Sequence, residues 1–296
     1  MTQAKITPSV EARPPARLRL AIDEAQQTLA HAGVPSPRHD AEILAAFVIG
    51  CPPGRLLMAG DFSAGQHTVF AGLVARRAAR VPLQHLTGSA PFRYLEVAVG
   101  PGVFVPRPET EVVAGWCVDQ LREQGSPAPL VVDLCAGSAA IALSIAHEVK
   151  GAVVHAVERE LPACEWARRN ATGTRVTVHE ADAAHALPEF SGLVDLVVAN
   201  PPYLPESDRD RFEPEVRDHD PAAALWGGPD GLDGPRMVEA AARRLLRPGG
   251  LAAVEHADHH GQAVAEIFGA SGAWEHIAVR QDLTGRDRFV TARRAS

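Results

Sequence analysis

A short turn at residues 200–203 carries the side chains best suited to chemistry. It reads Asn200, Pro201, Pro202, Tyr203. The turn directly follows the apolar run 194–199, which is typical of a buried strand. Prolines have a fixed φ angle and no N–H group, and each one forces the preceding residue into an extended conformation. We therefore expect a rigid turn at the carboxyl end of a strand, with carbonyl oxygens that no helix consumes.

Such a turn can hold a planar –NH2 group. The Asn200 side-chain oxygen and the Pro201 carbonyl can each accept one of its hydrogens, and Tyr203 can stack on its plane. Amide and aromatic amine nitrogens are poor nucleophiles because their lone pair is delocalised. Holding both hydrogens favours pyramidalisation and aims the lone pair at an electrophilic methyl group. The turn thus indicates amino-group methylation, with adenine and glutamine both open as substrates and a plain Asn-Pro turn as the alternative.

A second motif, residues 131–141, runs from an apolar strand through an acid and a tight turn into an apolar helix. In an open α/β sheet, nucleotide-like ligands bind beside such a crossover, and the free N–H groups of the helix start suit a carboxylate or phosphate. The motif is not a dinucleotide fingerprint, because position 135 is Cys and position 139 is Ala. An ordinary strand-to-helix turn remains the simpler alternative.

Two more acids follow the next strands of this pattern. Glu158 lies 25 residues after Asp133 and can accept both hydroxyls of a ribose, in bonds worth about 1.5–3 kcal/mol each. Asp182 follows the third strand, where it suits an adenine edge, although an acid at such a place is more often a helix cap. These acids indicate an adenosyl ligand without naming it.

An alternating α/β unit is needed to position these motifs. From residue 107 onward, short apolar runs alternate with helical stretches. This alternation predicts a doubly wound, mostly parallel sheet with helices on both faces and one antiparallel strand. The expected strands are 130–134, 152–157, 175–178, 193–199, 251–255, 274–279 and 288–292.

Three segments precede this unit, which spans residues 107–296. Over residues 16–80, apolar side chains recur at three-to-four spacing and predict a small all-α domain. Ser36 and Ser63 are the expected helix starts, the second with a capping box to Gln66. Residues 81–106 are rich in Gly, Pro and β-formers and are expected to form a linker with a hairpin. Residues 1–15 are expected to be a disordered tail.

Composition limits the class of protein. The chain has 296 residues and a formal net charge of −7. Proteins that bind DNA through its phosphates usually have an excess of basic residues, and this chain has none. The four cysteines show no disulfide-like framework, and neither a signal peptide nor an apolar run of membrane-spanning length is evident. We expect a cytoplasmic protein, a monomer by default, with no direct nucleic-acid contact.

Two clusters of ionisable residues have plain interpretations. His256, His259 and His260 lack a Cys or Glu partner at ligand spacing, so we expect exposed histidines at a helix start and no metal site. Arg76, Arg77 and Arg80 are expected to form a solvated helix face, with partner contact as the alternative.

The chain resembles the release-factor glutamine methyltransferases. The resemblance rests on segments that follow one another in the family's order: 80–88, 103–111, 133–141, 200–203, 227–232, 255–256 and 282–289. The Pro-Arg-Pro-Glu-Thr-Glu run at 106–111 is the specific part. A sister group that acts on a ribosomal protein typically has Ser-Pro after Pro-Arg. Adenine methyltransferases with the same turn generally lack the helical N-terminal domain.

The resemblance implies a Rossmann-like class I methyltransferase with S-adenosylmethionine as cofactor. Its substrate would be the side-chain amide nitrogen of the glutamine in the Gly-Gly-Gln motif of peptide chain release factors, and the N-terminal bundle would help to hold that protein. The implied cofactor-binding residues are Asp133, Cys135, Ala136, Gly137, Ser138, Ala139, Glu158, Asp182, Ala183 and Asn200. The implied catalytic and substrate-binding residues are Asn200, Pro201, Pro202 and Tyr203, with Phe104 at the border of the substrate pocket.

The chain departs from the family in its glycine loop. The family usually has Gly-Thr-Gly-Ser-Gly where this chain has Cys135–Ala139. Each missing glycine adds a Cβ where backbone should approach the cofactor. We therefore expect weaker cofactor binding that Ala139→Gly would tighten. Adenine methylation of DNA or RNA, glutamine methylation of a ribosomal protein, and a domain that binds a translation factor without methylating it remain the alternatives.

Overall fold

A computed structural model describes residues 16–296, in two compact units with the boundary after Thr87. The expectation for residues 1–15 lies outside the described residues. Over the described part of the chain, every helix is too short or too polar to cross a membrane.

The first unit is helical, as expected. Its helices are α1 (Ala16–His31), α2 (Pro37–Ile49), the 3-10 helix η1 (Pro53–Met58), α3 (Ala64–Ala78) and α4 (Leu83–Thr87). Helix α2 begins directly after Ser36. The capping box at the start of α3 is confirmed, because the Ser63 side chain accepts from the Gln66 N–H and the Gln66 side chain accepts from the Ser63 N–H. Apolar side chains of α1, α2 and α3 form one core.

The expected solvated arginine face is wrong for Arg77. Its Nε lies 2.7 Å from Asp40 Oδ2, and the two side chains are only 7% and 8% exposed. The three-to-four spacing that turns Leu73 into the core turns Arg77, one helical turn later, the same way. A buried charge is costly without its partner, so this pair ties α2 to α3.

The second unit contains a seven-stranded sheet in the order β5-β4-β3-β6-β7-β9-β8. The strands are β3 (Leu130–Leu134), β4 (Val153–Glu158), β5 (Val176–Glu180), β6 (Val194–Ala199), β7 (Leu246–Glu255), β8 (Trp274–Gln281) and β9 (Asp287–Arg294). Neighbours from β5 to β7 are parallel, whereas β9 is antiparallel to both β7 and β8. The prediction of a mostly parallel sheet with one reversed strand is confirmed.

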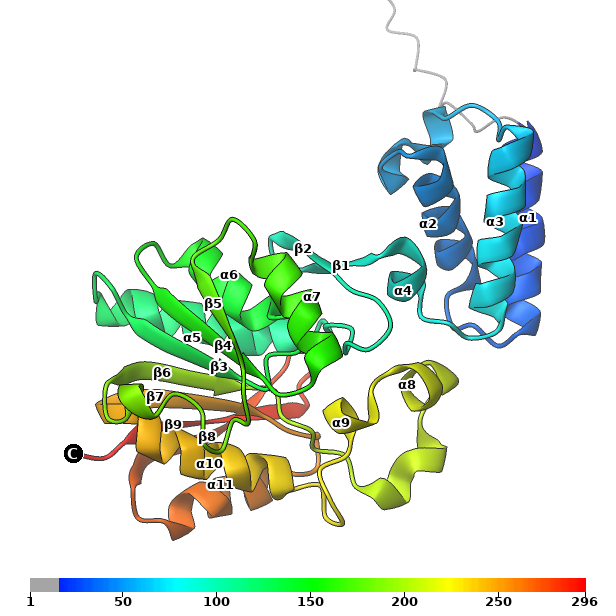
Figure 1. Ribbon diagram of the computed structural model, residues 1–296. Helices are drawn as coiled ribbons and strands as arrows, with labels where there is room; N and C mark the ends of the chain where they lie inside the picture. The colour runs from blue at the N-terminus through cyan, green and yellow to red at the C-terminus, as the bar shows by residue number, and fades with distance from the viewer. Residues whose placement is uncertain (1–15) are drawn as a thin grey trace, which may run out of the picture. The chain divides into compact units, whose positions relative to one another are not determined.

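Helices cover both faces of the sheet (Figure 1). On one face lie α5 (Thr110–Gln124), α6 (Ala140–Glu148) and α7 (Leu161–Ala171). On the other lie α10 (Asp233–Leu245) and α11 (Gly261–Ala270). Successive strand residues alternate between the two cores, so that Val198 packs on the first face and Val197 on the second. Because these strands are buried on both faces, nearly every residue in them is apolar, which is why continuous apolar runs in the sequence predicted them.

The segment expected to be a linker is largely part of the second unit. Its hairpin, β1 (Ser89–Phe92) and β2 (Leu95–Ala98), is antiparallel as expected. Alternate side chains of the hairpin, among them Phe92 and Val97, are buried in the same core as α5 and α6. The buried hairpin anchors the start of the segment 99–109, which leads to Thr110.

The connection from β6 to α10 contains the short helices η3 (Glu206–Arg211), α8 (Pro214–His219) and α9 (Ala222–Leu225). A further short 3-10 helix, η2 (Pro188–Phe190), precedes β6. Arg107 Nη2 lies 2.5 Å from Asp220 Oδ2, between α8 and α9. This ion pair links the connection to the segment before α5.

A glycine-rich segment supports the turn Asn200–Tyr203 from behind. A Cβ atom at Gly227 would lie 2.6 Å from the Pro202 carbonyl oxygen, and one at Gly234 would lie 2.3 Å from the same atom. At Gly231 it would lie 2.4 Å from the Tyr203 carbonyl oxygen. Backbone therefore packs directly on backbone here, and only glycine permits that distance.

Gly234→Ala should lower the free energy of unfolding by about 1–3 kcal/mol, because no rotamer change can relieve a contact with a carbonyl oxygen. Gly269→Ala is the matched control, since it also lies in a helix and its added Cβ would find its nearest neighbour 3.9 Å away. The control should be neutral or stabilising by up to about 1 kcal/mol. Urea unfolding followed by circular dichroism measures both. Equal effects of the two substitutions would show that the glycine segment does not support the turn.

Candidate active site

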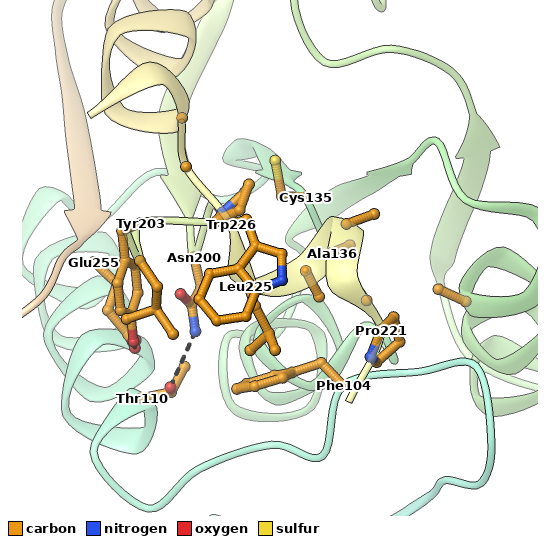
Figure 2. A pocket seen from close by; sticks show the side chains of 18 of the residues that line it. Phe104, Thr110, Cys135, Ala136, Asn200, Tyr203, Pro221, Leu225, Trp226 and Glu255 are labelled. Carbon is orange, nitrogen blue, oxygen red and sulfur yellow. Dashed lines mark hydrogen bonds between the residues drawn. The ribbon is translucent and has the colours of Figure 1, made fainter. Parts of the chain in front are cut away.

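The carboxyl ends of the central strands open onto a cavity of about 730 Å³ in the second unit. It brings together most of the residues that the sequence singled out. Those at the expected cofactor end are Cys135, Ala136, Gly137, Ser138, Glu158, Asp182 and Ala183. Those at the expected substrate end are Phe104, Asn200, Pro202 and Tyr203. Figure 2 shows Phe104, Asn200 and Tyr203 in the wall of this cavity. Asp133, Ala139 and Pro201 are not among the residues that line it.

Glu158 is held rigidly at the cavity wall. Its Oε2 accepts the Gly137 N–H at 2.8 Å, and its Oε1 accepts the Glu160 N–H at 2.8 Å. Each carboxylate oxygen keeps a further lone pair. The carboxylate can therefore accept two hydroxyls without changing its orientation, as a ribose requires.

Asp133 lies below the loop and away from the cavity. Its Oδ2 accepts the Ala142 N–H at 3.0 Å, in the first turn of α6. Burial raises the pKa of Asp133 to about 8, and its Oδ1 has no partner among the described residues. Its contact in this structure is with the helix start. Direct contact with a cofactor stays a prediction.

The loop before α6 uses three left-handed residues, Cys135 (φ 58°), Gly137 (φ 55°) and Ala139 (φ 64°). A residue with a Cβ pays roughly 1–2 kcal/mol for this conformation. Ala139 is fully buried in the core and Cys135 lines the cavity. The absence of glycine thus strains the backbone at Cys135 and at Ala139, and it places the Cys135 thiol in the cavity wall. Ala139 does not line the cavity, so its Cβ makes no contact there, and tighter cofactor binding by Ala139→Gly stays a prediction.

The chemistry of the cofactor end fits S-adenosylmethionine. Asp182 Oδ1 accepts the Ala184 N–H at 2.9 Å, which leaves its second oxygen for a ligand. Asp182 and Glu158 place acidic groups in the wall, which also contains the small apolar side chains of Ala181 and Ala183. Acids favour a ligand that carries positive charge and hydroxyls, and they repel a pyrophosphate.

Asn200 presents an acceptor toward the cavity. Its Nδ2 donates to Thr110 Oγ1 at 3.3 Å, so its oxygen is left for a ligand. Within residues 16–296, no backbone N–H donates to the Pro201 carbonyl oxygen. The pair of acceptors expected from the sequence is therefore free of competing backbone bonds.

A buried polar cluster lies beside Asn200. The Tyr203 hydroxyl donates to Glu255 Oε1 at 3.2 Å. Burial raises the pKa of Glu255 to about 7, and burial together with the Glu255 charge raises the pKa of Tyr203. Sequence reasoning gave no role to Thr110 or Glu255. The sequence could have indicated Glu255, because it ends a strand parallel to β6 and such strands end at the same edge of the sheet. Thr110 lies at the start of α5, next to that edge.

Aromatic and apolar side chains complete the substrate end. Leu225, Trp226 and Phe104 lie around Asn200 (Figure 2). The Arg107 guanidinium stacks 4.8 Å from the centre of the Phe104 ring. Arg107 also pairs with Asp220, whose pKa burial raises to about 6. Such walls suit a planar, uncharged group and exclude water from it.

The expectation of exposed histidines is wrong for two of the three. His256 is fully buried and His260 is 7% exposed, while His259 is exposed. His256 follows β7 directly and continues its burial, and its Nδ1 lies 2.8 Å from the Ala257 carbonyl oxygen. In the part of the chain that the structure describes, no group of three or more His, Cys, Asp or Glu side chains is placed to hold a metal ion.

Known proteins match the chain over both units. The model of the PrmC N-terminal domain matches residues 21–88, and that of a methyltransferase domain matches residues 131–219. The release factor glutamine methyltransferase of Streptomyces coelicolor is 53% identical, over 93% of this chain and 97% of that protein. The 4-amino-L-phenylalanine/4-methylamino-L-phenylalanine methyltransferase of Streptomyces pristinaespiralis is 41% identical, over 93% and 94%.

Among solved structures, the 16S rRNA N2 G1207 methyltransferase of T. Thermophilus, in complex with AdoMet and guanosine, aligns with a TM-score of 0.48 and 21% identity. The alignment covers 70% of this chain and 49% of that one. The sheet, the cavity and the full-length relatives lead to one conclusion. The chain is an S-adenosylmethionine-dependent methyltransferase and belongs to the family of the release factor glutamine methyltransferases.

Proposed function

We propose that this enzyme methylates the side-chain amide nitrogen of the glutamine in the Gly-Gly-Gln motif of peptide chain release factors, in the cytoplasm. The observation that supports this most is the pair of free acceptors, the Asn200 side-chain oxygen and the Pro201 carbonyl oxygen. Asn200 lines the same cavity as Glu158 and Asp182. Relatives named release factor glutamine methyltransferase match nearly the whole chain.

In the proposed reaction, the bound cofactor supplies an electrophilic methyl group on a sulfonium. The two acceptors hold both hydrogens of the amide and direct its lone pair at that methyl. The amide nitrogen would take this methyl group, with release of S-adenosylhomocysteine, and would lose one proton to solvent. Tyr203, Phe104 and Trp226 hold the amide plane and keep water away.

Glu158 and Asp182 are the proposed holders of the ribose and the adenine. The N–H groups of Ala140 and Ile141, at the start of α6, donate to no backbone carbonyl among the described residues. They suit the carboxylate of the cofactor, because a helix N-terminus favours negative charge.

A primary aromatic amine is a second candidate substrate. The relative from Streptomyces pristinaespiralis is named for an aminophenylalanine. Phe104, Tyr203 and Trp226 of this chain would also accept an aniline ring. Both substrates offer the same planar –NH2 group to Asn200. The enzyme must therefore distinguish them by the shape of the cavity walls and by how deeply the substrate has to enter.

Asn200→Ala should lower kcat by about a hundredfold or more, as expected when one preorganised polar contact to a transition state is removed. Steady-state methyl transfer measures the loss, and calorimetry with S-adenosylmethionine and thermal unfolding serve as controls for binding and folding. Near-normal turnover of this variant would refute the proposed role of the turn.

Labelled S-adenosylmethionine should transfer its methyl to a purified release factor, and not to the same factor with its Gly-Gly-Gln glutamine changed to alanine. DNA, the ribosomal protein substrate of the sister group and 4-amino-L-phenylalanine serve as competing substrates. The side-chain nitrogen is identified by mass spectrometry of the peptide. Label on DNA, on the ribosomal protein or on the free amine in preference to the release factor would overturn the proposal in favour of that substrate.

A further inference from the structure

We propose that Arg107 is a positioning residue for the substrate. Through its ion pair with Asp220, it holds two walls of the cavity at the spacing that a planar side-chain amide requires. This role rests on the proposed function, because the two walls enclose the place where that amide would bind.

The two walls come from distant parts of the chain. The first wall is the segment 99–109, which contributes Phe104 to the cavity. The second wall is the connection from β6 to α10, which contributes Leu225 and Trp226. Figure 2 shows these three side chains around Asn200. Neither wall belongs to the sheet, so the hydrogen bonds of the sheet do not fix the distance between them.

The second wall is built from very short helices. Helix α8 has six residues and α9 has four, whereas an isolated helix needs roughly 12–15 residues to be even marginally stable in water. Backbone bonds anchor the far end of this wall. The Leu204 N–H donates to the Leu225 carbonyl, and the Gly227 N–H donates to the Leu204 carbonyl, both at 2.9 Å. The junction of α8 and α9 precedes this anchor, and Asp220 lies in that junction.

Arg107 contacts both walls. Its Nη2 donates to Asp220 Oδ2 at 2.5 Å, and its guanidinium lies 4.8 Å from the centre of the Phe104 ring. The Asp220 side chain is only 1% exposed, so water cannot take the place of the guanidinium. A buried carboxylate without its partner is strongly destabilising. The pair therefore favours the arrangement in which the junction of α8 and α9 lies against the segment 99–109.

Arginine is the residue type that can make both contacts at once. The face of its planar guanidinium stacks on an aromatic ring, while the N–H groups at its edge donate to a carboxylate. Lysine supplies the charge but has no planar face. A single group thus fixes the Phe104 ring on one wall relative to Asp220 on the other.

The two walls and the turn should affect different kinetic constants. Asn200 and Pro201 act on the nitrogen that changes during the reaction, so their contacts matter most in the transition state. The walls contact the rest of the amide, which changes little. Contacts that are equal in the ground state and the transition state affect KM and leave kcat unchanged. Loss of the ion pair should therefore raise KM, the opposite of the effect expected for Asn200→Ala.

Arg107→Met keeps an apolar stem on Phe104 and removes the ion pair. It should raise the KM for the release factor about tenfold, with kcat within about threefold of the wild type and the affinity for S-adenosylmethionine unchanged. Arg107→Lys should recover part of the loss. A fall in kcat at wild-type KM would overturn the proposal.

The Asp220→Asn variant tests whether the two residues act through one contact. In that background, Arg107→Met should raise KM by less than it does alone. The double variant also removes the uncompensated carboxylate, so it should be at least as stable to heat as Arg107→Met while its KM stays high. Independent effects on KM, or recovery of KM together with stability, would overturn the proposal.

The ion pair of Arg247 and Asp195 provides a matched control. Arg247 Nε lies 2.7 Å from Asp195 Oδ1, the side chains are 42% and 14% exposed, and neither residue lines the cavity. Arg247→Met should leave the KM for the release factor within about twofold of the wild type. An equal rise in KM for this control would show that any lost ion pair has the same effect, against a positioning role.

Hydrogen exchange separates this inference from the proposed function, because it needs no substrate. Backbone amides of residues 214–226 should exchange at least about threefold faster in Arg107→Met than in the wild type, with those of residues 135–148 unchanged. Unchanged exchange at 214–226 would overturn the positioning role even if release factors are methylated. Faster exchange in an enzyme that does not methylate release factors would support the role of the ion pair and refute the proposed substrate.

Discussion

The site depends on one constraint: the chain must leave the buried strand β6 at Asn200 with its acceptor groups still free. Most exits from a parallel strand lead into a helix or a hydrogen-bonded turn, which would consume them. Here two prolines remove donors and fix the backbone. Glycines of the segment 227–234 then allow backbone to pack on the carbonyl oxygens of Pro202 and Tyr203. The turn is rigid because it is supported from behind by atoms that cannot move aside.

The sheet order explains why one cavity holds both halves of the reaction. From β3 the chain winds outward through β4 to β5, and then returns to place β6 on the other side of β3. The loops after β3, β4 and β5 carry the groups suited to the cofactor. The loops after β6 and β7 carry those suited to the substrate. Because the two windings diverge between β3 and β6, the cavity lies at the switch point of the sheet.

Apolar runs and turn chemistry in the sequence were enough to predict the strands, the reversed strand, the capping box of α3 and the places of Glu158 and Asn200. The periodicity of apolar residues predicts which positions are buried, but it does not predict which polar partner allows a charged side chain to be buried. For that reason Arg77 and His256 were expected in solvent, although both are buried. Thr110 and Glu255 were missed because their contacts join elements far apart in the chain. The left-handed backbone of Ala139 likewise depends on how the loop closes on the strand ends.

The most direct test is a crystal structure of the enzyme with S-adenosylhomocysteine and a peptide that contains Gly-Gly-Gln. We expect the glutamine amide nitrogen at about 2.7–3.2 Å from both the Asn200 side-chain oxygen and the Pro201 carbonyl oxygen, with the Asn200 nitrogen still on Thr110. A glutamine whose amide oxygen accepts from the Asn200 nitrogen would refute the proposed role of the turn. So would a peptide bound with its glutamine outside the cavity.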